Sequence, residues 1–258
     1  MSASLLTSLG VTGTDVFLAC LVTLAAGFVK GAVGFAMPLI MISAFSSFLP
    51  PHLAVAGLIL PTLVTNLSQA TRQGLSPAIA TARDRWRFLV ATVVFIGVSA
   101  QFLDDIPRMA YLLLLGVPVT AFAALQLAGV PLAFKLQHRT RAEWTLGVVG
   151  GIYGGVSGIW GPPLLVYLLS TGTPKTEMIR AQGVVFLIGS VALLSAHLQT
   201  GLANPASMAF SGVLVVPAVL GMMLGFRLQD RLPAEQFRRW TQGLLVVTGL
   251  NLVRQALF

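Results

Sequence analysis

Long apolar runs separated by short polar loops form the dominant pattern of this chain. Six of the runs are close to the roughly 20 residues that one helical crossing of a bilayer needs, and two are much longer. The eight runs cover residues 16–49, 53–71, 86–103, 109–130, 144–171, 178–198, 206–226 and 236–257. The pattern therefore predicts an all-α polytopic membrane protein.

The two longest runs, 16–49 and 144–171, do not fit a single crossing. As continuous helices they would measure about 50 and 42 Å, whereas the hydrocarbon core of a bilayer is about 30 Å thick. Both runs contain glycine and proline, the residues that most readily interrupt a helix. We predict that each run is a re-entrant hairpin of two half-helices that meet near the bilayer midplane, around 30–35 and 154–160.

The same glycine and proline spacing, GxxxGxxGxxxP, appears in both long runs. The two copies are Gly27, Gly31, Gly34 and Pro38, and, 124 residues later, Gly151, Gly155, Gly158 and Pro162. A duplicated motif predicts two membrane repeats, 1–131 and 132–258, each with one broken hairpin and three transmembrane helices. Paired broken helices in two repeats are typical of secondary transporters, which bind their substrates at the breaks.

The positions of lysine and arginine favour the hairpins. If all eight runs crossed the membrane, the two sides would carry eight and seven basic residues, which is no bias. If the two long runs return to the side from which they enter, thirteen basic residues share one side and only Arg108 and Arg254 lie opposite. Cytoplasmic loops are normally enriched in lysine and arginine. The hairpin arrangement gives the repeats inverted topology and predicts that both termini lie outside the cytoplasm.

Composition agrees with a chain that is surrounded by a lipid bilayer. Hydrophobic residues make up 56% of the chain and charged residues 9%, whereas about a quarter of the residues in soluble domains are charged. The net charge of +8 lies in short loops, where membrane orientation explains it, so we expect no nucleic-acid partner. With one cysteine, Cys20, and three scattered histidines, we expect neither a disulfide within the chain nor a metal or other cofactor.

Polar groups near the predicted breaks are the candidate substrate contacts. Lys30 is the only basic residue deep within a run, and an intramembrane charge is costly and by default functional. Half-helix N-termini also favour negative charge, so we predict a small anionic substrate. The candidate substrate-binding residues are Lys30, Gly31, Gly34, Asn66, Gln69, Tyr153, Gly155, Ser157, Gly158, Trp160 and Gln182. The competing interpretations are close helix packing for the glycines and helix–helix hydrogen bonds for the polar side chains.

One pair of residues suggests an enzyme instead. Gly155–Gly158 has the form GxSG, and His197 follows about forty residues later, which resembles the serine and histidine of rhomboid intramembrane proteases. In that alternative Ser157 is the nucleophile and His197 the base. However, Val33 stands at the position of Ser157 in the first repeat, and the topology places His197 at the outer end of its run. We therefore expect a protein that is not an enzyme.

The motif in both halves, together with Arg180-Ala181-Gln182-Gly183 at the start of the sixth run, resembles the sulfite exporter TauE/SafE family. The resemblance spans almost the whole chain. It implies a multi-pass permease of the bacterial inner membrane that moves sulfite or an organosulfur or other organic anion by alternating access. All acidic residues lie at run ends or in loops, so the energy source stays open, with a coupling proton as one option. A passive anion channel and a homodimer are also compatible with the sequence.

Overall fold

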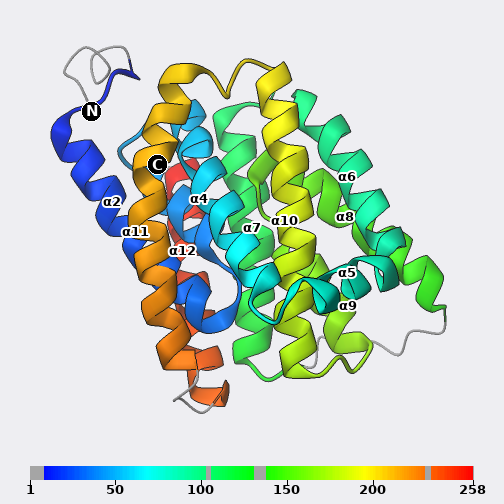
Figure 1. Cartoon of the computed structure of the whole chain (residues 1–258). Coiled ribbons are helices and arrows are strands. Elements are labelled where there is room, and N and C mark those ends of the chain that lie inside the picture. Colours follow the sequence, from blue (N-terminus) through cyan, green and yellow to red (C-terminus); the bar gives the residue numbers. More distant parts are fainter. Residues whose placement is uncertain (1–8, 103–105, 131–137, 230–233, 258) are drawn as a thin grey trace.

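The computed structural model describes residues 9–102, 106–130, 138–229 and 234–257, and every regular element within these ranges is helical (Figure 1). The first half contains α2 (Gly13–Val33), α3 (Met37–Phe45), α4 (Pro51–Thr71), α5 (Leu75–Asp84), α6 (Trp86–Ser99), a 3-10 turn (Ala100–Phe102) and α7 (Arg108–Leu127). The second half contains α8 (Arg139–Ser157), α9 (Gly161–Ser170), α10 (Lys175–Gln199), α11 (Pro205–Gln229) and α12 (Ala234–Leu257). The expected all-helical class is confirmed. The predicted boundary between the repeats, 131/132, lies outside the described residues.

Five of the described helices, α2, α4, α7, α10 and α11, are long and apolar enough to cross a membrane. Large apolar side chains on the outer helices, including Phe17 of α2, Val94 of α6 and Leu220 of α11, are exposed, as expected for a lipid-facing surface. The chain is thus a multi-pass membrane protein. Helix starts follow local rules: Thr12 and Asp15 form a capping box at α2, and Pro107 and Pro174 precede α7 and α10.

Both long apolar runs are broken into two helices at equivalent positions. Helix α2 is capped by Gly34, which has a left-handed φ of 93° and whose N–H donates to the Lys30 carbonyl at 2.6 Å. Helix α8 ends in the same way at Gly158, with a φ of 69° and a bond to the Gly154 carbonyl at 2.7 Å. A side chain disfavours this left-handed conformation, which explains the requirement for glycine. The breaks therefore occupy residues 34–36 and 158–160.

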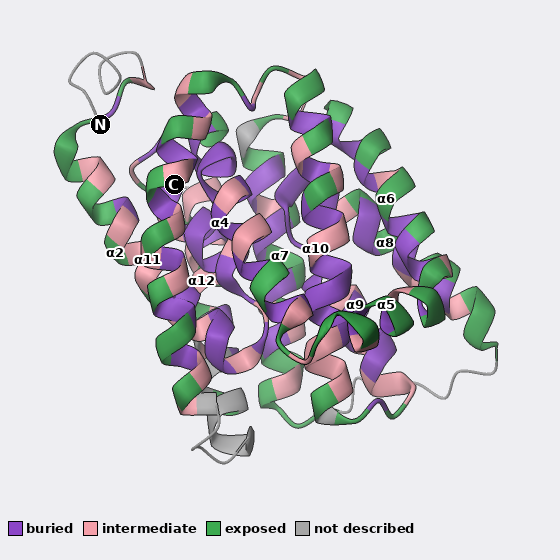
Figure 2. Ribbon diagram, viewed as in Figure 1, coloured by how far each residue is buried: buried purple, intermediate pink, exposed green. Residues whose placement is uncertain are grey.

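Helices α4 and α10 form the centre of the bundle. In the apolar parts of these helices 72% and 61% of residues are buried, against 39% in α2 and in α11 (Figure 2). Around this centre, α2 packs along α11, α8 packs along α6, and α7 packs along α12. Each broken run therefore packs against a helix from the other half of the chain.

Glycines allow α2 to pack closely against α11, and α8 against α6. A Cβ atom at Gly31 would collide with the main-chain carbonyl of Met222 on α11. A Cβ atom at Gly155 would lie 2.6 Å from the main-chain carbonyl oxygen of Ile96 on α6. Gly27 and Gly151 make similar contacts one turn earlier. These glycines therefore lie at close helix–helix contacts, like the small residues of small-xxx-small motifs in membrane helices.

The segment 72–87, which the hydropathy pattern treats as a loop, contains the short helix α5. Its ten residues include too few apolar positions to form a run, and it bends sharply into α6, with 80° between the two helices. Arg180 of α10 donates to Thr81 of α5 at 2.9 Å, and Arg85 pairs with Glu177 of α10 at 3.2 Å. Helix α5 is thereby held across the N-terminal part of α10 (Figure 1).

Candidate functional site

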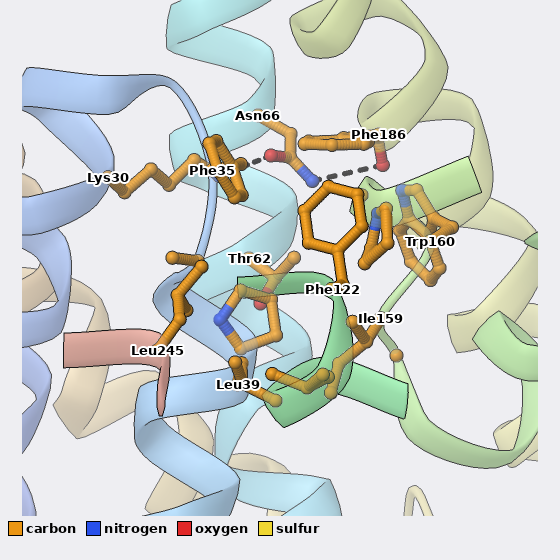
Figure 3. Close-up of a pocket in the computed structure, with 16 residues that line it drawn as sticks. Lys30, Phe35, Leu39, Thr62, Asn66, Phe122, Ile159, Trp160, Phe186 and Leu245 are labelled. Carbon is orange, nitrogen blue, oxygen red and sulfur yellow. Dashed lines mark hydrogen bonds between the residues drawn. The ribbon is translucent and has the colours of Figure 1, made fainter. Parts of the chain in front are cut away.

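The two helix breaks come together around a small cavity in the middle of the bundle (Figure 3). Its volume is about 30 Å³, which is room for one or two water molecules. The lining consists of Lys30, Phe35, Ala36, Pro38, Leu39, Thr62, Asn66, Val119, Phe122, Gly158, Ile159, Trp160, Gly161, Pro162, Phe186 and Leu245. Four of the predicted substrate-binding residues, Lys30, Asn66, Gly158 and Trp160, are among them.

Lys30 lies in the last turn of α2, and only 1% of its surface is exposed. Its Nζ donates to Thr65 Oγ1 at 2.9 Å and to Asn66 Oδ1, both on α4. In the described part of the chain, no ion pair includes Lys30. Free carbonyls at the C-terminal end of α2 favour a positive charge there. Lys30 is therefore a buried basic side chain whose described hydrogen-bond partners are neutral.

Asn66 connects this lysine to the opposite half of the bundle. Its Nδ2 donates to the Phe186 carbonyl at 2.9 Å and to Ser190 Oγ at 2.7 Å, both on α10. Asn66 and Ser190 are separated by the 124-residue offset of the glycine motif, so equivalent positions of the two halves touch each other. With its amide group held in this way, Asn66 presents its Oδ1 to Lys30.

Gln69 and Gln182 lie on either side of the first break. Gln69 Nε2 donates to the Gly34 carbonyl at 2.9 Å and to the Ile179 carbonyl at 3.0 Å. Gln182 Oε1 is buried against Gly34, and it has no hydrogen-bond partner among the described residues. At the second break, the side chains nearest to Gly158 are Leu58 and Leu193. The first break is thus surrounded by amide groups and the second by apolar groups.

The remaining predicted residues lie outside the cavity lining. Gly31 and Gly155 face α11 and α6, as described above. Tyr153 donates its hydroxyl to the Leu115 carbonyl at 3.0 Å. Ser157 donates to the Tyr153 carbonyl at 2.5 Å and accepts from the Ile159 N–H at 3.0 Å. The Ser157 proton is therefore directed to a main-chain carbonyl within its own turn, which is not the arrangement of an activated nucleophile.

Thr62 is a lining residue that was absent from the predicted set. Its side chain is 2% exposed, and within the ranges that the structure describes Oγ1 has no hydrogen-bond partner. Thr62 precedes Asn66 by four residues on α4, so both side chains lie on the same helix face. That spacing was the available signal in the sequence. Within the same ranges, no cluster of His, Cys, Asp or Glu is suited to hold a metal ion.

Comparison with known proteins gives one informative match. A family model described as sulfite exporter TauE/SafE matches residues 19–252, which is nearly the whole chain. The comparisons with curated proteins and with solved structures gave no match. The matched range includes both helix breaks and every residue that lines the cavity.

Proposed function

This chain belongs to the sulfite exporter TauE/SafE family, and from that premise we propose that it is a secondary transporter of a small anion. The proposed substrate is sulfite or an organosulfur or other organic anion. The proposed location is the bacterial inner membrane, and the proposed mechanism is alternating access around the cavity between the two breaks.

The observation that carries the proposal is the environment of Lys30. A charged ammonium group in a membrane interior is costly unless opposite charge or several hydrogen bonds compensate for it. The described partners of Lys30, Thr65 and Asn66, are neutral. An anion in the adjoining cavity would supply the opposite charge, so anion binding would relieve a cost that the empty protein bears.

The directions of the helices support inverted topology. In Figure 1, α4 runs from the upper to the lower end of the bundle, and its counterpart α10 runs from the lower to the upper end. Helices α6 and α11 are likewise antiparallel counterparts. In transporters with inverted repeats, one half rocks against the other around a fixed central site. The cavity has room for only one or two water molecules, so an anion of four or more heavy atoms requires the breaks to move apart.

Cysteine labelling tests the topology. In a Cys20→Ala background, Gln199→Cys is expected to react with an impermeant maleimide only from outside the cell, and Arg227→Cys only from the cytoplasmic side. Helix α11, with 25 residues, separates the two positions, and both are exposed. Permeabilised cells should label both variants, which controls for reactivity. The reverse assignment would support eight plain crossings and contradict the hairpins.

Transport in proteoliposomes tests the function. We expect saturable uptake of radiolabelled sulfite or of a small sulfonate, faster than in protein-free liposomes. Unlabelled anion trapped inside should accelerate this uptake several-fold, because exchange returns the binding site to the outside. Saturable uptake without such counterflow would indicate a passive channel rather than a transporter. Transport of cations alone, such as choline, would contradict the anion proposal.

A further inference from the structure

The polar groups of the cavity are unevenly distributed. Of the described residues that line it, Lys30, Thr62 and Asn66 carry the polar side chains, apart from the indole N–H of Trp160. These three belong to α2 and α4. Figure 3 shows Lys30 and Asn66 in the upper part of the site and Leu39 and Ile159 in the lower part, with Thr62 and Leu245 between them. The remaining labelled side chains are the aromatic rings Phe35, Phe122, Trp160 and Phe186.

This asymmetry arises from different side chains at equivalent backbone positions. At the 124-residue offset, Lys30 corresponds to Gly154 and Thr62 corresponds to Phe186. Trp160, which corresponds to Ala36, covers Gly154: a Cβ atom added there would lie 2.6 Å from the indole ring. Trp160 also packs against Phe186 with 6.1 Å between ring centroids. The second half therefore places aromatic rings where the first places an ammonium and a hydroxyl group.

The Thr62 hydroxyl is the group in the cavity for which the protein provides no described partner. Thr62 lines the cavity, and more than nine-tenths of its surface is buried. Its Oγ1 makes no hydrogen bond within the described ranges. A buried hydroxyl without a partner is unfavourable, and a ligand oxygen beside it would accept its proton. Because Thr62 lies on the same face of α4 as Asn66, that oxygen would belong to the group bound by Lys30.

We propose that the site selects an organic oxyanion with a short apolar tail over an inorganic anion such as sulfite. This inference rests on the proposed function and assigns its substrate class. Lys30 and Thr62 bind the charged head, and the tail packs against Phe122, Trp160 and Phe186. The three oxygens of sulfite point in different directions. Within this cavity some of them would therefore face phenylalanine rings, which donate no hydrogen bond. An alkyl tail instead gains affinity from burial, about fourfold for each methylene that leaves water.

Binding to the purified full chain in detergent tests this inference. The probes are sulfite, methanesulfonate, ethanesulfonate and butanesulfonate, titrated by calorimetry at one ionic strength. We expect sulfite to bind most weakly and the dissociation constant to fall about fourfold per added methylene. Phe122→Ala is expected to flatten this dependence on tail length. A single sulfonate head is common to the three alkyl probes, so their differences report the tail alone.

The Thr62→Val variant tests how the charged head of the anion is bound. The substitution keeps the side-chain shape and removes the hydroxyl, and we expect it to weaken all three sulfonates by a similar factor of about ten. Thr62→Ser should restore most of the affinity, and Thr71→Val, on the same helix but outside the cavity, should match the wild type. Sulfite binding as tight as butanesulfonate, or a Thr62→Val protein with wild-type affinities, would overturn the inference and leave the proposed function standing. Failure of every anion to bind would overturn both.

Discussion

Gly31→Ala is expected to reduce the yield and the melting temperature of the folded protein, although it adds only one methyl group. The Cβ atom would collide with the main-chain carbonyl of Met222, and a main-chain atom cannot rotate away as a side chain can. Helices α2 and α11 would have to separate along their contact. Overpacking of this kind costs about 1–3 kcal/mol, which is a large part of the stability of a typical protein. Thermal unfolding in detergent, followed by size-exclusion chromatography, measures the effect.

Gly97→Ala on α6 is the matched control for this experiment. Apart from its chain neighbours and the backbone of its own helix, no described atom lies within 4 Å of the position of its Cβ atom. Alanine is a better helix former than glycine by about 1 kcal/mol, so this variant should melt at the wild-type temperature or above it. Equal melting of Gly31→Ala and Gly97→Ala would show that α2 and α11 are less closely packed than the structure indicates.

Lys30→Met should weaken anion binding more than tenfold, which corresponds to about 1.4 kcal/mol or more. Methionine fills similar space without the charge, and it also removes the cost of burying an ammonium group. The variant should therefore fold, and the loss of anion affinity should appear in the dissociation constant and in the transport rate. Lys30→Arg should retain part of the affinity because it preserves the charge.

Arg141→Met is a control for the loss of one positive charge, because Arg141 is exposed in the first turn of α8. It should bind anions as the wild type does. Unchanged binding by Lys30→Met would mean that Lys30 serves only to hold α2 against α4 through Thr65 and Asn66.

The helix breaks could be predicted from the sequence because glycine and proline act locally. The duplicated motif indicated interruptions around 30–35 and 154–160, and the structure has them at 34–36 and 158–160. Lys30 was also identifiable, because a basic residue within an apolar run is rare. Helix α5 was not predicted, since ten mixed residues do not give a hydropathy signal.

The roles of the motif glycines could not be separated from sequence alone. Gly31 and Gly34 are three residues apart, yet one faces the main chain of α11 and the other caps α2 in a left-handed conformation beside two glutamine side chains. Thr62 was missed for a similar reason. A threonine in an apolar helix usually bonds to its own main chain, as Thr65 does to the Pro61 carbonyl. What distinguishes Thr62 is the lack of a described partner, which only the three-dimensional structure reveals.

The packing of α2 against α11, which belongs to the other half of the chain, has a consequence for biosynthesis. The ribosome completes α11 roughly 200 residues after α2, which takes about 10 to 40 s at the usual rate of chain elongation. Throughout that interval the glycine face of α2 lacks the helix against which it packs in the finished protein. Lys30 can form its hydrogen bonds to Thr65 and Asn66 much earlier, as soon as α4 has entered the membrane. The nascent chain can thus bury its charge early, but its first helix must wait in the bilayer, open to chaperones and membrane proteases, until synthesis is almost complete.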